Sequence, residues 1–237
     1  MLAIDLSSSM LAEDFRPRNR LAVAKAMTKE FIAGRRSDRI GVVAFAGEAL
    51  TQVPLTTDYQ ILLQAVENLQ AGQLEDGTAI GLGIATAANR LREAPGESRV
   101  LILLTDGVNN RGVDPLAAAR AASVFGIRIY GIGVGSEGMA PVPVGRTPTG
   151  LRYELHPVQI DERLLTQIAE MTGGRYFRAR DPAALRRIYD QIDVLERTRV
   201  ETRTYIRYAE LFRWPLAFGL LALLGELVLV ARRSPLP

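Results

Sequence analysis

Residues 2–9 read LAIDLSSS and residues 99–107 read RVLILLTDG. In each stretch an apolar run leads directly into side chains that carry oxygen, namely Asp5 with its serines and Thr105 with Asp106. An uninterrupted apolar run is typical of a strand that is buried on both faces of a parallel sheet. Because ligands of such sheets bind at the carboxyl ends of the strands, these stretches predict the fold and also the edge of the sheet that carries the site.

Strand and helix patterns alternate through the first 195 residues. Helical spacing or capping signals occur over residues 19–35, 58–68, 79–91, 115–125, 161–172 and 181–195, and strand patterns over residues 38–46, 48–55, 99–104, 127–132 and 175–178. The alternation predicts an α/β fold with a doubly wound, mostly parallel sheet and helices on both faces. Pro54 places the strand at 48–55 on an edge. Residues 137–158 break the pattern and predict a β-hairpin insertion.

A third polar stretch, Asp76-Gly77-Thr78, opens the helix expected from residue 79. From these three stretches we select two carboxylates and three hydroxyls as ligands, and none of the stretches contains histidine or cysteine. The predicted metal ligands are Asp5, Ser7, Ser9, Thr78 and Asp106. Such a set suits Mg²⁺, with Mn²⁺ or Ca²⁺ as alternatives. Because it holds too few charges to enclose the ion, a partner's carboxylate can complete the coordination, which favours metal-dependent adhesion over catalysis.

Composition and motifs argue against several other classes of function. The 237 residues carry a net charge of +3, which does not indicate a nucleic-acid-binding field. The chain contains no cysteine, which excludes thiolate metal sites and cysteine nucleophiles. The single histidine, His156, leaves a hydrolase triad without an evident base. The glycines at 131, 133 and 135 lack the spacing of a dinucleotide loop. We therefore expect a protein that is not an enzyme.

Residues 214–231, WPLAFGLLALLGELVLVA, are apolar apart from Glu226. As a helix this segment would extend ~27 Å, close to the ~30 Å thickness of a bilayer core, and Trp214 and the Arg232-Arg233 pair flank it as interfacial anchors do. The pattern predicts a C-terminal transmembrane helix, with a charged juxtamembrane segment at 196–213 and a short tail at 232–237. Glu226 is equally well interpreted as a functional group in the membrane or as a side chain that reaches the interface.

The site residues also carry a family resemblance. The pattern Asp5-x-Ser7-x-Ser9, followed later by Thr78 and Asp106, resembles the metal-ion-dependent adhesion site of von Willebrand factor type A domains. Further stretches are similar to the bacterial Bat (aerotolerance) proteins, BatA in particular. They are residues 11–15, 38–42, 45–48, 74–80, 103–107 and 173–178, together with the apolar tail. Ser8 stands where many relatives have glycine, which removes no ligand.

The resemblance implies a vWA/Rossmann-like domain over residues 1–195 whose two serines and Thr78 can bind the ion directly, while its aspartates act directly or through water. It also implies a membrane-anchored interaction module that works with other Bat proteins and a MoxR-type AAA+ ATPase. Relatives have strand residues and transmembrane segments before Leu2, so an N-terminally truncated chain is expected. The expected location is the bacterial inner membrane with an extracytoplasmic domain, and the alternative is a cytoplasmic, tail-anchored domain.

The sequence is also compatible with two other functions. The first is a Mg²⁺-dependent phosphohydrolase on a similar sheet, which needs a nucleophile or base beside the metal and a cation for the phosphate. Serines follow Asp5 instead, and neither of the two lysines, Lys25 and Lys29, lies near it in sequence. The second is a structural anchor whose site binds no metal, which direct titration with Mg²⁺ or Mn²⁺ would separate from adhesion.

Overall fold

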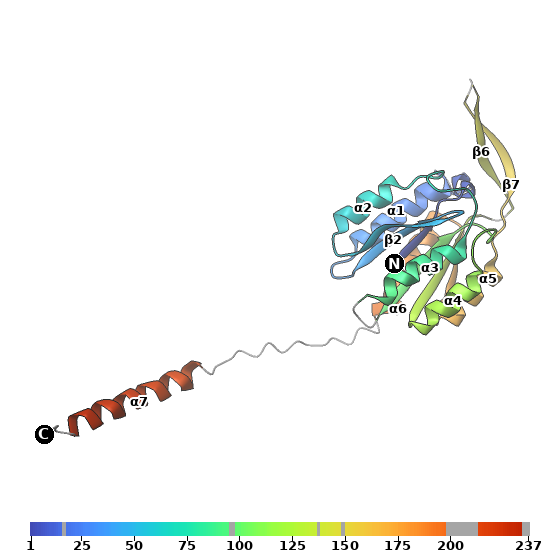
Figure 1. Cartoon of the computed structure of the whole chain (residues 1–237). Helices are drawn as coiled ribbons and strands as arrows, with labels where there is room; N and C mark the ends of the chain where they lie inside the picture. The colour runs from blue at the N-terminus through green and yellow to red at the C-terminus, as the bar shows by residue number, and fades with distance from the viewer. Residues whose placement is uncertain (16–17, 95–97, 137, 148–149, 198–212, 234–237) are drawn as a thin grey trace. The chain divides into compact units, whose positions relative to one another are not determined.

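The structure is a computed structural model that describes residues 1–15, 18–94, 98–136, 138–147, 150–197 and 213–233 (Figure 1). The chain divides into two units, Met1–Val200 and Glu201–Pro237. The first unit holds the sheet, its covering helices and all the predicted metal ligands.

A six-stranded sheet in the order β3-β2-β1-β4-β5-β8 forms the centre of the first unit. Its strands are β1 (Leu2–Asp5), β2 (Ile40–Phe45), β3 (Ala49–Thr56), β4 (Arg99–Thr105), β5 (Ile127–Val134) and β8 (Tyr176–Ala179). Only the β2–β3 pair is antiparallel among these neighbours. The predicted mostly parallel sheet is therefore confirmed, and Pro54 does lie in an edge strand.

The apolar runs form strands because alternate side chains enter two separate cores. In β1, Leu2 and Ile4 pack into one core and Ala3 into the other. Helices α1 (Arg20–Ala33), α2 (Tyr59–Asn68) and α6 (Pro182–Arg197) cover the first core, and α3 (Ile80–Arg92), α4 (Pro115–Val124) and α5 (Glu162–Met171) cover the second. Helices on both faces of the sheet confirm the predicted α/β class.

Side-chain caps fix where four of the helices begin. The carboxylates or amide of Asn19, Asp58, Asp114 and Asp161 accept hydrogen bonds from backbone N–H groups in the first turns of α1, α2, α4 and α5. These N–H groups have no partner within the helix itself, so the caps stabilise each start. Pro115 is the first residue of α4, where its missing N–H is not needed.

A β-hairpin stands apart from the central sheet, as predicted for residues 137–158. It consists of β6 (Met139–Thr147) and β7 (Gly150–Pro157), which pair antiparallel with Ala140 opposite His156. The hairpin follows β5 in the chain, and Figure 1 shows it extending away from the sheet and its helices. The backbone N–H of Glu13 donates to the carbonyl oxygen of Pro141 at 2.9 Å, which ties the hairpin to the segment after β1.

The second unit contains the helix α7 (Arg213–Arg233), which includes the predicted residues 214–231. Over the part of the chain that the structure describes, no helix has both the length and the apolar character needed to cross a membrane. The helix that we predicted is thus present, whereas its assignment as a transmembrane helix is not supported. Residues 198–212 of the predicted juxtamembrane segment and residues 234–237 of the predicted tail lie outside the described residues.

Candidate metal centre

Asp5 is the last residue of β1 and is fully buried. Its Oδ1 atom accepts the backbone N–H of Ser7 at 2.9 Å, and its Oδ2 atom accepts the hydroxyl of Thr105 at 2.6 Å. Thr105 ends the neighbouring strand β4, so the parallel pairing of β1 with β4 brings the two residues together. Both oxygens of this carboxylate are therefore held in fixed positions at the carboxyl edge of the sheet.

Ser7 immediately precedes a short 3₁₀ helix, η1 (Ser8–Leu11), which contains Ser9, where the sequence indicated only a loop. The Oγ atoms of Ser7 and Ser9 lie 3.0 Å apart, and the Ser9 hydroxyl donates to Oδ1 of Asp106 at 2.7 Å. The tight turn of η1 brings the two hydroxyls onto one side, beside the carboxylate that follows β4. Four of the five predicted ligands are thus joined in one hydrogen-bonded group.

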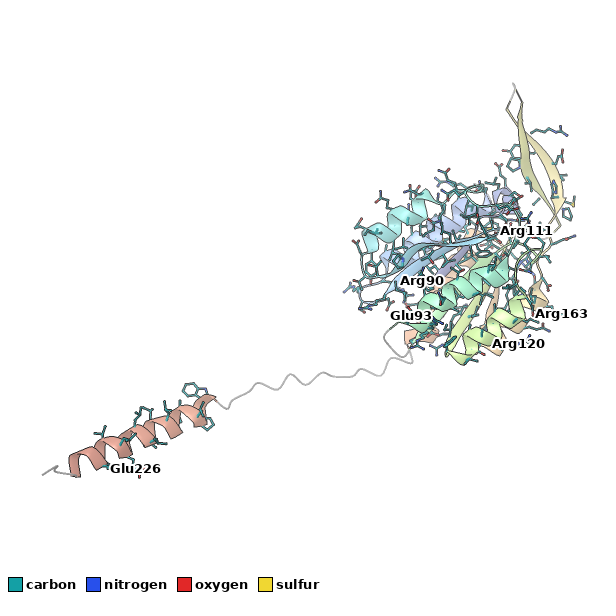
Figure 2. The ribbon with its side chains drawn as sticks, viewed as in Figure 1. Arg90, Glu93, Arg111, Arg120, Arg163 and Glu226 are labelled. Carbon is teal, nitrogen blue, oxygen red and sulfur yellow. The ribbon has the colours of Figure 1, made fainter. Side chains whose placement is uncertain are left out.

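Thr78 reaches the same place from the loop before α3. Its backbone N–H donates to Oδ1 of Asn110 at 2.9 Å, and its carbonyl oxygen accepts the Asn110 N–H at 3.0 Å. A Cβ atom at Gly107 would lie only 3.1 Å from the Thr78 hydroxyl oxygen, so Gly107 allows this close approach. Figure 2 labels Arg111, which follows Asn110, at the end of the sheet from which the hairpin extends.

Asp76 fixes the Thr78 loop to the serine turn. Its two carboxylate oxygens accept the backbone N–H of Ser8 at 3.0 Å and the Ser8 hydroxyl at 2.9 Å. These hydrogen bonds lower the pKa of Asp76, the backbone bond from Ser8 having the largest effect. Ser8 and Asp76 are therefore positioning residues. The sequence offered no sign of this pair beyond the place of each residue beside a predicted ligand.

A buried arginine that the sequence analysis missed contacts Asp106. Arg20, the first residue of α1, is 3% exposed and donates from Nη1 to Oδ2 of Asp106 at 2.7 Å. Its Nε and Nη2 atoms donate to the two oxygens of Asp14 at 2.7 and 2.5 Å. Asp14 also accepts the backbone N–H and the hydroxyl of Ser136, each at 2.8 Å. A continuous chain of contacts therefore connects Asp106 to the segment that leads into the hairpin.

Burial and charge shift the acidities of these carboxyl groups. Burial raises the pKa of Asp5 to about 7; the nearby Asp106 acts in the same direction, and hydrogen bonds from Ser7 and Thr105 oppose it. Burial also raises the pKa of Asp106 against the effect of the Arg20 guanidinium. For Asp14, burial is outweighed by the bonds from Arg20 and Ser136, and its pKa is lowered. Asp106 is thus paired with Arg20, which it shares with Asp14, whereas the hydrogen bonds to Asp5 come from the neutral groups of Ser7 and Thr105.

The donor set fits a hard divalent cation. Ser9, Thr78 and Asp106 line a cavity of about 700 Å³, while Asp5 and Ser7 are joined to them through the hydrogen bonds above. Within the described ranges no group of three or more His, Cys, Asp or Glu side chains is placed to hold a metal ion. A site here would combine two carboxylates with hydroxyl oxygens, which suits Mg²⁺ better than Zn²⁺.

We expect metal binding and stability to depend on pH through Asp5. Because a proton competes with the ion for a carboxylate of pKa about 7, Mg²⁺ affinity should fall roughly tenfold from pH 8 to pH 6. In the metal-free protein the raised folded-state pKa means that the proton stabilises the fold, so the free energy of unfolding should decrease as the pH rises through about 7. Calorimetry and urea unfolding in chelator at both pH values would measure these effects. Equal stability and affinity at the two values would contradict the prediction.

Comparison with known families agrees with this geometry. The sequence pattern of the von Willebrand factor type A domain matches residues 1–191. The chain belongs to this family. Its members are typically metal-dependent protein-interaction modules, and they commonly bind a divalent ion at the metal-ion-dependent adhesion site. The resemblance to von Willebrand factor type A domains that the sequence suggested is therefore confirmed.

Among relatives, a UPF0353 protein of Mycolicibacterium paratuberculosis is 34% identical over 212 residues, which cover 81% of this chain and 58% of that protein. The crystal structure of BatB from Bacteroides thetaiotaomicron is 32% identical with a TM-score of 0.71, and the match covers 83% of this chain and 97% of that one. The predicted similarity to Bat proteins is thus confirmed, with BatB rather than BatA as the named match. The chain spans little more than half the length of the curated relatives it matches.

A more distant likeness bears on the fold alone. Proximal thread matrix protein 1 from the mussel byssus is 20% identical with a TM-score of 0.61, and the match covers 81% of this chain and 46% of that one. That structure is described with a zinc-occupied metal-ion-dependent adhesion site.

Proposed function

We propose that this protein is an interaction module that binds an acidic side chain of a partner protein through a divalent cation. In this proposal Asp5, Ser7, Ser9, Thr78 and Asp106 hold Mg²⁺, with Mn²⁺ or Ca²⁺ as alternatives. The bound ion would supply a positive centre that accepts one further oxygen ligand. The protein's own residues would position that centre at the floor of the cavity.

The observation that carries the proposal is the arrangement of Ser9 and Asp106 at the cavity surface. Their side chains hydrogen-bond at 2.7 Å, and the second oxygen of Asp106 is already held by Arg20. One oxygen of Asp106 and the serine hydroxyls are thus directed to one place. Hydroxyls carry no charge, so an ion held there keeps much of its attraction for a carboxylate from outside.

The nature of the partner follows from the same chemistry and from the relatives. A Glu or Asp side chain is the ligand that a hard cation with an open position prefers. The similarity to BatB suggests other Bat proteins as partners. The resemblance of the sequence to Bat proteins further suggests an association with a MoxR-type AAA+ ATPase.

We further propose that the module has no hydrolytic activity of its own. His156 is exposed on the hairpin, and its Nε2 atom lies 4.0 Å from a carboxylate oxygen of Glu154 on the same strand. The cation nearest the candidate centre, Arg20, is occupied by two carboxylates and is 3% exposed. His156 does line the cavity, but on the hairpin side, and Arg20 is already paired with Asp106, so the proposal assigns neither a base nor a phosphate clamp.

Direct titration tests the proposal. We expect Mn²⁺ and Mg²⁺ to bind the purified full chain and to raise its thermal midpoint, because an ion that binds only the folded state stabilises it. The Ser7→Ala/Ser9→Ala variant should lose this effect. Partner capture should then require the ion and be lost on chelation. Binding of neither ion at millimolar concentration, or capture that is indifferent to the ion, would reject the proposed function.

A further inference from the structure

The cavity beside the candidate metal centre has a second wall. Facing the loops that carry Ser9, Thr78 and Asp106, this wall is formed by Ala140, Val142, Pro143, His156, Pro157, Val158 and Gln159. We call the space between the two walls the hairpin groove. Its volume of about 700 Å³ is far more than one carboxylate group fills, and it is in the ~300–1,000 Å³ range of ligand-binding pockets.

The hairpin wall is held firmly against the metal-binding loops. The hydroxyl of Tyr153 donates to Oε1 of Glu13 at 2.8 Å, and the N–H of Glu13 donates to the carbonyl oxygen of Pro141 at 2.9 Å. At the base of the hairpin, the N–H of Val158 donates to the carbonyl oxygen of Gly138 at 2.8 Å. A wall that is already ordered adds little entropic cost when a ligand binds.

The chemistry of the two walls differs. Most of the hairpin wall is apolar, with Val142, Pro143 and Val158 half-buried and Ala140 buried. Among the described residues that line the groove, Asp106 provides the one carboxylate, and Arg20 pairs with it. A carboxylate that enters the groove therefore meets little repulsion, and a divalent ion at the floor would attract it. An aliphatic side chain next to that carboxylate would lie against the hairpin.

The edge of β6 argues for recognition through side chains. The carbonyl oxygen of Pro141 points away from β7, because it accepts a bond from Glu13. Pro141 and Pro143 share this side of the strand, and neither has an N–H to offer there. A partner strand could not form a regular ladder along this edge. A partner segment in the groove would therefore be recognised through its side chains, by the metal and by apolar contacts.

We propose that the hairpin groove binds an extended segment of a partner protein in which an aliphatic side chain lies two residues from the acidic side chain that reaches the metal. Residues two apart in an extended chain point to the same side, so both side chains face the groove. This inference rests on the proposed function and deepens it. The metal supplies the attraction for the carboxylate, and the hairpin selects its neighbour.

Short fluorescein-labelled peptides test this on the purified full chain in MgCl₂. One peptide, GLGDG, presents Asp with Leu two residues away; a second, GSGDG, has Ser in place of Leu; a third, GLGNG, has Asn in place of Asp. By fluorescence anisotropy, GLGDG should bind about tenfold more tightly than GSGDG, because burial of one Leu side chain is worth roughly that factor. The variant Val142→Asp should remove this preference. Leu155→Asp, at an exposed position on the same hairpin outside the groove lining, should keep it.

The possible outcomes distinguish failure of the apolar subsite from failure of the proposed metal-dependent function. Equal binding of GLGDG and GSGDG, both still dependent on Mg²⁺, would overturn the apolar subsite and leave the proposed function standing. Equal binding of GLGNG and GLGDG would reject the metal–carboxylate function itself. Loss of Mg²⁺ binding in Val142→Asp would also overturn the inference, because the wall would then belong to the metal centre. Self-association that Val142→Asp abolishes would assign the groove to a second copy of this chain instead.

Discussion

Replacing Asp106 by Ala is expected to weaken Mg²⁺ or Mn²⁺ binding by ~100-fold or more, since one of two carboxylates is lost from the candidate centre. The fold should persist. Arg20 keeps both of its bonds to Asp14, and removal of the Asp106 charge relieves its repulsion with Asp5. Calorimetric titration with MnCl₂ measures the affinity, and circular dichroism checks that the variant is folded.

Asp114→Ala provides the matched control. Asp114 is also an aspartate in the loop that follows β4, but it caps α4 through the N–H groups of Leu116 and Ala117 and does not line the hairpin groove. Its loss should cost ~1 kcal/mol of stability, as for other helix caps, and should leave the metal affinity unchanged. If Asp106→Ala binds the ion as well as the parent chain does, the assigned ligand set is wrong.

The fold could be predicted from local signals that agree with one another. The runs Leu2–Ile4 in β1 and Val100–Leu104 in β4 are wholly apolar because both faces of these strands are covered, and that pattern can be seen without knowing the neighbouring strands. Asp58 and Asp161 marked helix starts because capping acts within one turn. The η1 turn was missed because three consecutive serines are equally compatible with a loop.

The candidate site was predictable only in part. Its five proposed ligands follow strand ends, and the topology of a parallel sheet places such ends together. Arg20 follows no strand, and an arginine at the first turn of a helix ordinarily faces solvent. Its burial depends on the conformation of the segment that carries Asp14 and on the approach of Ser136 from beyond β5. Contacts of this kind arise from tertiary structure, so no periodicity in the sequence reports them.

Replacing Arg20 by Met is expected to lower the free energy of unfolding in chelator by ~3–5 kcal/mol, because a buried charge left without its partner is strongly destabilising. Two buried carboxylates, Asp14 and Asp106, would lose the same guanidinium. Excess Mg²⁺ should restore part of the loss, because the ion can replace the missing positive charge beside Asp106. Urea unfolding with and without MgCl₂ measures both effects.

The surface variant Arg186→Met controls for the loss of an arginine as such. Arg186 is 57% exposed and pairs with Glu30 at the surface, so its loss should change stability by less than ~1 kcal/mol, with no response to Mg²⁺. Adding Asp14→Asn to Arg20→Met should recover stability in chelator, since it removes one of the two unpaired charges, whereas Asp14→Asn alone should destabilise. Additive losses in the double variant would mean that Arg20 acts through packing. Recovery would establish it as the counter-charge that keeps the metal-free centre folded.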